Sequence, residues 1–305
     1  MSDANRETFE QLRPLLFSIA YRMLASVSDA EDVVQDAFIR YERALADGVA
    51  VESTRAYLAA LVTRLAIDQI RSARVRRENY SGQWLPEPLL TDENDPLTES
   101  EHAESISMAF LLLVQQLQPL ERAAFLLHDV FSYSHGEIAS MLGKTEAHCR
   151  QLALRARKRI EAGRPRLERR APSRDELARR FFNAMKQGDT ALLLQLVAPE
   201  VTVFGDGGGN APQWSKPIVG REHVAALLVG VGARLVELGG ALELHEINGQ
   251  PGALVFDSEH RLINVFALDV GDGVVHAVRS VINPDKLRHL GPVADIRALL
   301  RRRSN

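Results

Sequence analysis

One stretch near the middle of this 305-residue chain constrains its fold most strongly: Tyr133 to Ile160, YSHGEIASMLGKTEAHCRQLALRARKRI. Ser134 and Glu137 form the capping-box pattern that begins a helix. Gly143 can adopt the left-handed backbone of a tight turn at little steric cost, and Thr145 is the expected N-cap of a second helix. Two short helices around a tight turn are typical of a helix-turn-helix.

The second of these helices has one apolar and one basic face. Apolar residues recur at helical spacing and are expected to face inward: Cys149, Leu152, Ala153, Ala156 and Ile160. The opposite face has the size and charge to enter a DNA major groove. Its residues are Arg150, Gln151, Leu154, Arg155 and Lys158. An ordinary helical hairpin with a solvated basic face has the same pattern, so the rest of the chain must decide.

The net charge of -3 conceals a strong segregation of charge. Residues 55–80 hold six arginines against two acids, and residues 144–180 hold 13 bases against five acids. Acids concentrate in residues 1–54, with ten against five bases, and in residues 81–110, with seven and no lysine or arginine. Because a nucleic-acid-binding protein needs basic charge only where phosphates lie, two separate basic segments indicate two contacts with one nucleic acid.

The composition excludes several classes of protein. No apolar run approaches the ~20 residues of a membrane span, and the polar, acidic N-terminus is not a secretory signal. The single cysteine, Cys149, excludes an intrachain disulfide and fits a reducing cytoplasm. We therefore expect a cytoplasmic protein that does not contact a membrane.

The first 173 residues are predicted to be helical except for two linkers. Residues 1–80 form a first helical domain, in which Ser28 and Glu31 make a second capping box. Residues 81–100 contain three prolines and are predicted to be an extended linker, since proline is excluded from helix interiors. Residues 101–163 form a second helical domain around the helix-turn-helix, and residues 164–173 form a basic linker.

The remainder combines helices with a run of strands, in a domain at 174–290 followed by a basic tail at 291–305. Helices are expected at 175–187, at 190–198 and from residue 222; strands are expected at 201–204, 241–247, 253–256, 262–270 and 274–282. Gly-Asp-Gly at 271–273 indicates a hairpin between the last two strands. The predicted fold class is multidomain: two all-α domains, the second a helix-turn-helix, followed by an α+β domain.

Three segments, in order, resemble the motifs of bacterial extracytoplasmic-function sigma factors of the sigma-70 family. The family's core-polymerase-binding helix resembles SDAEDVVQDAF at Ser28–Phe38. Its minus-ten-recognition helix resembles AYLAALVTRLAIDQIRS at Ala56–Ser72, and its minus-thirty-five-recognition element resembles the helix-turn-helix. Three ordered motifs over roughly residues 8–162 are far more specific than any one of them.

Residues 174–290 resemble a SnoaL-like domain of the wider NTF2-like fold, an α+β cone or barrel. Sigma factors with this extension form a SigJ-like subgroup, and three of its short signatures occur here. They are WLPEP at Trp84–Pro88, DGGG at Asp206–Gly209 and NPDKL at Asn283–Leu287. The chain is thereby identified as a member of this subgroup.

The resemblance implies three sets of contact residues. Core polymerase would be bound by Asp32, Gln35 and Asp36. The minus-ten element would be contacted by Arg64, Asp68, Arg71 and Arg74, and the minus-thirty-five element by Arg150, Gln151 and Arg155. Compensation of the helix dipole alone accounts for Asp32 but less well for Gln35 and Asp36, which lie a turn or more inside the helix. A solvated side chain is the alternative for Arg64, which replaces the asparagine of many relatives.

Two hypotheses of different class remain open for the C-terminal domain. In the first it regulates the sigma domains through a contact between the three signatures, with the residues Trp84, Leu85, Pro86, Asp206, Gly207, Gly208, Gly209, Asn283, Pro284, Asp285 and Lys286. In the second its apolar pocket binds a ligand or catalyses acid–base chemistry. The candidates for chemistry are Asp206, His245, Asp257, His260, His276 and Arg279, but no two of them have a recognisable catalytic spacing. We expect no catalysis, and a small regulatory ligand in the C-terminal domain stays possible.

The prediction is therefore an alternative sigma factor that binds core RNA polymerase and recognises promoter DNA at its minus-ten and minus-thirty-five elements. It is expected not to be an enzyme, to need no cofactor or metal, and to require no separate anti-sigma factor. The alternative is a stand-alone helix-turn-helix regulator with a ligand-sensing or enzymatic NTF2-like domain. Dependence on core polymerase distinguishes the two.

Overall fold

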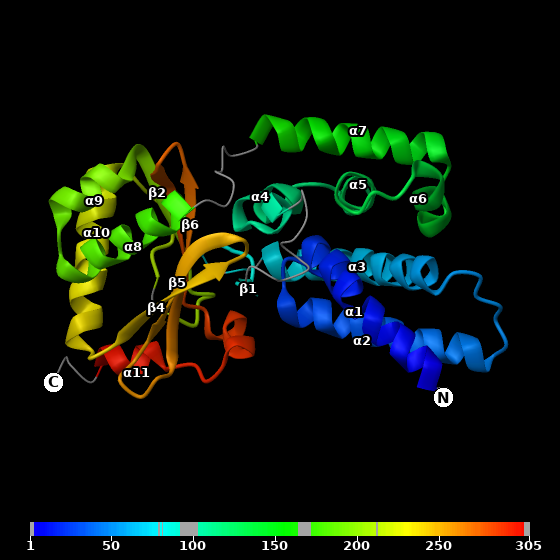
Figure 1. The fold of residues 1–305 in the computed structure, drawn as a ribbon, viewed down its shortest axis with the longest axis horizontal. Helices are drawn as coiled ribbons and strands as arrows, with labels where there is room; N and C mark the ends of the chain where they lie inside the picture. Colours follow the sequence, from blue (N-terminus) through cyan, green and yellow to red (C-terminus); the bar gives the residue numbers. More distant parts are fainter. Residues whose placement is uncertain are drawn as a thin grey trace. The chain divides into compact units, whose positions relative to one another are not determined.

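The computed structural model describes residues 3–78, 80, 82–91, 103–163, 172–211 and 213–301. They fall into two compact units (Figure 1), which are Met1–Asn79 with Asn94–Arg164 and Tyr80–Glu93 with Pro165–Asn305. The second unit therefore includes a short segment that comes before the second half of the first unit. Within the described residues, no helix is long and apolar enough to cross a membrane.

The first unit begins with three helices that pack on one another: α1 (Asp3–Leu24), α2 (Val27–Ala46) and α3 (Thr54–Glu78). Their apolar faces form the core of this half, which includes Leu16, Ile19, Val34, Leu58 and Val62. A loop around Gly48 separates α2 from α3, and Gly48 has a φ of 78°.

The start of α2 differs from the prediction. Its N-cap is Ser26, whose hydroxyl accepts a hydrogen bond from the amide of Asp29 at 3.1 Å. The predicted capping box of Ser28 and Glu31 is therefore wrong, because the helix already begins at Val27. Glu31 instead pairs with Arg13 at 2.6 Å.

In the described residues, the second half of the first unit contains six further helical elements and ends with the helix-turn-helix. They are η1 (Ala103–Ile106), α4 (Met108–Gln115), α5 (Pro119–Phe125), the π-helix η2 (Leu126–Val130), α6 (His135–Leu142) and α7 (Glu146–Gly163). Ser134 and Glu137 form the reciprocal capping box of α6, and Gly143 ends this helix with a φ of 63°. Thr145 caps α7 by accepting a hydrogen bond from the amide of His148 at 3.3 Å. The local prediction of the helix-turn-helix is confirmed.

The second unit is a seven-stranded sheet with helices packed on it. Its strands lie in the order β1 (Leu90–Thr91), β4 (Ala241–Ile247), β5 (Gln250–Phe256), β6 (Leu262–Gly271), β7 (Val274–Val281), β2 (Val197–Asp206) and β3 (Ile218–Val219). All neighbours are antiparallel except β2 and β7. Asp272 and Gly273, with φ of 51° and 73°, form the predicted hairpin turn between β6 and β7.

Three helices, α8 (Pro172–Gln187), α9 (Thr190–Leu196) and α10 (Arg221–Glu237), pack together beside the sheet (Figure 1). The core between helices and sheet includes Phe181, Phe182, Met185, Leu228 and Phe266. Because the sheet follows an all-helical first unit, the predicted order of all-α domains and an α+β domain is confirmed.

Two segments outside the predicted α+β domain also belong to the second unit. Leu90 and Thr91, predicted to lie in a linker, form β1 and pair with Ile247 and Glu246 of β4. The predicted basic tail contains the short helix α11 (Ile296–Arg301), preceded by the short turns η3 (Pro284–Lys286) and η4 (Arg288–Leu290). Ile296 and Leu299 pack against the core, so the tail continues the domain. Residues 92–100 and 164–171 of the two predicted linkers lie outside the described residues.

Candidate functional site

The acidic face of α2 presents the three residues expected to bind polymerase. Asp32, Gln35 and Asp36 are exposed, whereas Val33 and Val34 between them are buried. Within the described part of the chain, none of the three side chains has a hydrogen bond or ion pair. They are therefore open to a partner.

Two neighbouring carboxylates of α2, by contrast, have partners inside the first unit. Asp29 accepts a hydrogen bond from Gln69 at 3.0 Å, and Glu31 is the partner of Arg13. Asp29 and Glu31 therefore contribute contacts within the first unit. The exposed side chains of Asp32, Gln35 and Asp36 make no such contacts, so a structural role within this unit does not explain them.

The residues expected to contact the minus-ten element project from α3. The Nε of Arg64 donates a hydrogen bond to the carbonyl oxygen of Met141, near the end of α6, at 2.8 Å. Asp68 and Arg71 are exposed and lie 3.5 Å apart as an ion pair. Arg74 belongs to α3, but its side chain lies outside the described residues. Arg64 is thus held by the helix-turn-helix itself.

The recognition helix α7 exposes all three residues expected to contact the minus-thirty-five element. Arg150 pairs with Glu146 at 2.6 Å, and Gln151 lies beside it on the exposed face. Arg155 lies 3.5 Å from the carboxylate of Glu121 in α5. Leu154, between them, is 50% exposed and lies on the same face.

Glu121 and Arg122 in α5 organise this region, although no motif in the sequence indicates either. Glu121 is buried and holds both Arg155 and, at 2.9 Å, Arg159. Arg122 is 2% exposed and donates to the carbonyl oxygens of Met23 at 2.6 Å and Gln115 at 2.9 Å. A buried arginine that satisfies carbonyl oxygens has no sequence signal beyond its place in an apolar helix.

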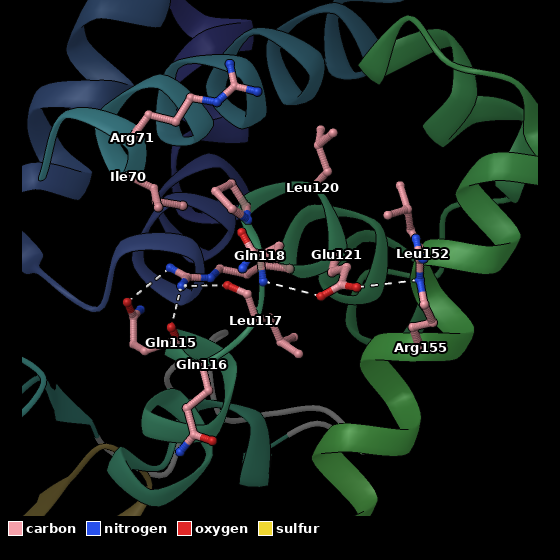
Figure 2. A pocket seen from close by; sticks show the side chains of 12 residues that line it. Ile70, Arg71, Gln115, Gln116, Leu117, Gln118, Leu120, Glu121, Leu152 and Arg155 are labelled. Atoms are coloured by element: carbon pink, nitrogen blue, oxygen red, sulfur yellow. Dashed lines mark hydrogen bonds and ion pairs between the residues drawn. The ribbon is translucent and has the colours of Figure 1, made fainter. Parts of the chain in front are cut away.

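A cleft of about 870 Å³ separates α3 from α5 and α7 in the first unit. Arg71 lines it from α3 and Arg155 lines it from α7, with Gln115 to Arg122 between them (Figure 2). Residues expected to contact two distant promoter elements therefore lie on the walls of one cleft.

The second unit contains a buried ionic cluster that joins all three short signatures. Asp206, at the end of β2, is fully buried and accepts hydrogen bonds from the amide of Leu85 at 2.8 Å and from the Lys286 ammonium at 2.7 Å. Tyr80 also donates its hydroxyl to Asp206, at 2.5 Å, and accepts a hydrogen bond from Asn283 at 2.8 Å. A carboxylate can accept several hydrogen bonds, so the single side chain of Asp206 satisfies all of these donors.

Lys286 completes the cluster, which we call the linker clamp: Tyr80, Trp84, Leu85, Asp206, Asn283 and Lys286. Its ammonium donates to the carbonyl oxygen of Leu85 as well as to Asp206, and lies 4.3 Å from the Trp84 ring and 5.1 Å from the Tyr80 ring. Burial, and then the charge of Asp206, raise the pKa of Tyr80 well above its ordinary value. Tyr80 therefore stays a neutral hydrogen-bond donor.

The glycines of the DGGG signature permit the close packing of the linker clamp. A Cβ on Gly208, which has a φ of 60°, would clash with the side-chain amide of Asn283, and a Cβ on Gly207 would clash with the carbonyl oxygen of Ala211. Gly209 also has a positive φ, of 72°, and its carbonyl oxygen accepts from Arg297. A larger residue at position 207 or 208 would displace the backbone around Asp206.

The rest of residues 83–91 is fixed by hydrogen bonds along the second unit. Leu89 and Asn248 form two hydrogen bonds with each other. The Leu89 amide donates to the Asn248 side chain at 3.0 Å, and the Asn248 amide donates to the Leu89 carbonyl oxygen at 2.8 Å. Thr91 donates to Glu246 at 2.9 Å, and Gln83 donates to the Trp214 carbonyl oxygen at 3.2 Å. Pro86 is buried, Pro284 begins η3, and Asp285 pairs with Arg288 at 2.8 Å. This segment is an integral part of the second unit.

The candidates for acid–base chemistry do not come together. Asp257 pairs with Arg261 at 2.8 Å; burial opposes its ionisation, but hydrogen bonds from Arg261 and Glu259 outweigh this and lower its pKa. The other candidates also contact residues that have no catalytic role. His245 is exposed and lies 3.8 Å from Glu243, and His260 stacks on Phe256. His276 contacts the carbonyl oxygen of Gly271 at 3.0 Å, and Arg279 pairs with Asp269. None of the six candidates lines the apolar cavity of this unit.

Comparison with known proteins decides the family. The Sigma-70 region 2 model matches residues 8–76, and the Sigma-70, region 4 model matches residues 107–160. The chain is 38% identical over 293 residues to ECF RNA polymerase sigma factor SigJ of Mycobacterium tuberculosis, covering 91% of each protein. The chain belongs to the extracytoplasmic-function RNA polymerase sigma factors.

The similarity of this sigma factor to its relatives includes the C-terminal unit. The crystal structure of Mycobacterium tuberculosis SigJ matches with a TM-score of 0.73 and 34% identity, and the match covers 92% of this chain and 98% of that one. The probable sigma factor SigI of the same species is 28% identical over 277 residues, 90% of this chain. The protein therefore directs promoter-specific transcription initiation by RNA polymerase, and the stand-alone regulator is not favoured.

Proposed function

We propose that this sigma factor is regulated by its own C-terminal unit through the linker clamp. The observation that carries the proposal is the fully buried Asp206 carboxylate, which holds Tyr80, Leu85 and Lys286 together. Region 4, at residues 107–160, lies between the clamped segment and α8 in the chain. The clamp and α8 therefore tether region 4 to the same unit on both sides.

The contact surfaces follow the exposed faces described above. Core polymerase binds the α2 face at Asp32, Gln35 and Asp36. The minus-ten element is contacted by Arg64, Asp68, Arg71 and Arg74, and the minus-thirty-five element by Arg150, Gln151 and Arg155. This assignment is supported by the exposure of these side chains on α2, α3 and α7, and for Arg74 by its place in the helix alone.

Initiation requires regions 2 and 4 to separate. Promoter elements about 25 base pairs apart are roughly 85 Å apart at about 3.4 Å per base pair. A compact body of about 150 residues, the size of the first unit, has a radius of gyration of only ~15 Å. The contact between Arg64 and the Met141 carbonyl oxygen is therefore one that breaks when both elements are bound.

The protein acts in the cytoplasm with polymerase and DNA, needs no separate anti-sigma factor and performs no catalysis. The fused unit supplies the restraint that a separate inhibitor would otherwise provide. The absence of catalysis is supported by the scattered positions of the six candidate residues. A stable stoichiometric inhibitor that co-purifies with the chain would contradict the proposal that no separate anti-sigma factor is needed.

Transcription in vitro with core RNA polymerase and the DNA upstream of the chain's own gene tests the proposal. Lys286→Met removes the cation of the clamp, and Arg288→Met removes an exposed cation two residues away as a matched control. We expect Lys286→Met to change transcript yield several-fold and Arg288→Met to leave it unchanged. Equal yields from both variants and the parent protein would overturn regulation by the clamp.

The same assay tests the polymerase surface and the class of protein. The double variant Asp32→Lys, Asp36→Lys is expected to abolish transcription without loss of stability, because both side chains are exposed. If the parent protein supports no transcription with core polymerase but shifts duplex DNA alone, the proposed interfaces are wrong.

A further inference from the structure

The second unit contains a cavity of about 390 Å³ between α10 and the strands β5, β6 and β7. Its size falls within the ~300–1,000 Å³ of small-molecule sites. The walls are mainly aliphatic and aromatic, with Leu227 and Val231 from α10 and Val255, Phe266 and Ile282 from the sheet side. Such a surface favours an apolar ligand.

One part of the wall is polar and neutral. The hydroxyl of Ser280 accepts hydrogen bonds from Gln213 at 3.2 Å and from Asn264 at 2.9 Å, and donates to the side-chain oxygen of Asn264 at 3.2 Å. Ser280 is 1% exposed and Asn264 is 7% exposed, so this group is well removed from bulk water. Each side-chain amide has two N–H donors, and these contacts use only one of the two in Gln213 and in Asn264. A ligand carbonyl or hydroxyl can therefore be bound here.

Among the residues that the structure describes, the lining contains no carboxylate and no histidine. The charged residue in this described lining, Arg234, is exposed and pairs with Glu237 at 3.5 Å. A charged ligand group would lose its hydration in this cavity without gaining a buried counter-ion, which is costly. The cavity chemistry therefore favours a neutral ligand and provides no acid–base catalyst.

The polar part of the wall is in direct contact with the linker-binding elements. Gln213 packs against the DGGG signature, since a Cβ on Gly207 would lie only 2.9 Å from that of Gln213. The next residue, Trp214, lines the cavity and accepts the hydrogen bond from Gln83 of the linker through its carbonyl oxygen. Its indole Nε1 is buried without a hydrogen-bond partner in the described part of the chain. Movement of this segment on ligand binding would reach the linker directly.

We propose that this cavity binds a neutral, largely apolar small molecule that carries a carbonyl or hydroxyl group, and that binding alters the linker clamp. The coupling of ligand binding to the linker clamp rests on the proposed function of the clamp. The ligand contacts Ser280, Asn264 and Gln213 with its polar group and the apolar walls with its remainder. Segment 213–214 and the end of β7 transmit its presence to the clamp, because Ile282 of the wall is followed directly by Asn283.

Three naphthalene probes of similar size test the chemistry, with full-length protein and calorimetry or ligand-observed NMR. They are 2-acetonaphthone, 2-ethylnaphthalene and 2-naphthoate. We expect the ketone to bind about two- to tenfold more tightly than the hydrocarbon, as one neutral hydrogen bond provides, and the carboxylate to bind most weakly. No binding of the ketone, or tightest binding of the carboxylate, would overturn the proposal.

Three variants test whether the probe binds in the cavity. Gly230 lines it on α10, and a Cβ at this position meets no atom within 4 Å, so larger side chains can enter without a backbone clash. Gly230→Leu is expected to fill the space and abolish binding of the ketone, whereas Gly230→Ala keeps it. Ser280→Ala is expected to remove the preference for ketone over hydrocarbon. Unchanged ketone affinity in Gly230→Leu would place the probe elsewhere.

Hydrogen exchange of the Leu85 amide, which donates to Asp206, reads out the coupling. We expect saturating 2-acetonaphthone to change its exchange rate at least several-fold in the parent protein and not in Gly230→Leu. An unchanged rate with the probe bound would refute the coupling. Transcription assays of the clamp contain no probe, so failure of the ligand proposal and failure of clamp regulation are separate results.

Discussion

Replacement of Asp206 by asparagine tests the linker clamp at its centre. The variant keeps the shape and an acceptor for the Leu85 amide, but leaves the Lys286 ammonium without a counter-ion. The Lys286 side chain is 8% exposed and its ammonium lies 2.7 Å from the carboxylate. Removal of one partner from a buried pair costs about 3–5 kcal/mol. Because the ammonium keeps its contact with the Trp84 ring at 4.3 Å, we expect the lower end, about 3 kcal/mol.

Tryptophan fluorescence during urea unfolding of the full-length protein measures this loss selectively. The chain has two tryptophans, Trp84 and Trp214, and both lie in the second unit. A loss of about 3 kcal/mol raises the unfolding equilibrium constant of that unit roughly a hundredfold. The control is Asp285→Asn, which removes an exposed carboxylate of the same turn and is expected to cost at most about 1 kcal/mol.

The double variant Asp206→Asn, Lys286→Met decides whether the pair is the cause. If the two charges interact, removing both costs less than the sum of the single losses, by at least about 1 kcal/mol. Additive losses, or a cost for Asp206→Asn no larger than that of Asp285→Asn, would refute the reasoning.

Three further predictions concern the helix-turn-helix. Ser134→Ala is expected to lower the stability of the first unit by about 1 kcal/mol in urea unfolding followed by far-ultraviolet circular dichroism. Because hydrogen bonds from Ser134 hold the pKa of Glu137 below its ordinary 4.5, this deficit should persist above pH 4.5 and shrink as the pH falls below 4.5 through that lowered pKa. Burial raises the pKa of Cys149, so its thiol should react with a disulfide reagent at pH 8 only after unfolding, and native-state labelling at the rate of free cysteine would contradict this. Arg155→Ala should weaken promoter binding by the holoenzyme by about 1–3 kcal/mol without loss of stability, and unchanged affinity would remove this residue from the interface.

The sequence predicted the helix-turn-helix well because its determinants are local. Ser134, Gly143 and Thr145 act within one turn of themselves, so their roles need no knowledge of tertiary contacts. The same local reasoning failed at the start of α2, where Ser26 and Ser28 are both plausible caps. The choice depends on where the helix packs, and Ser26 is the one buried at its N-terminus.

The linker clamp could be predicted only in outline. Glycines and short signatures indicated the segments that meet, but Tyr80 carries no signal of its own and the prolines predicted only extended backbone. The partner of Leu90 in β4 is Ile247, more than 150 residues further along the chain, and no local pattern specifies such a register. The buried Arg122 was missed for the same reason, because its acceptors come from α1 and α4.

The second unit is built from two separate stretches of the chain, so its parts are synthesised at different times. A ribosome completes residues 80–91 and the whole of region 4 before it makes β2, β4 and the NPDKL turn, which are needed to receive the linker. During synthesis, Leu85 and its neighbours therefore exist without Asp206 and Lys286. A newly made chain therefore has a period in which region 4 is present and the linker clamp is not, and any chain truncated after region 4 lacks the clamp permanently.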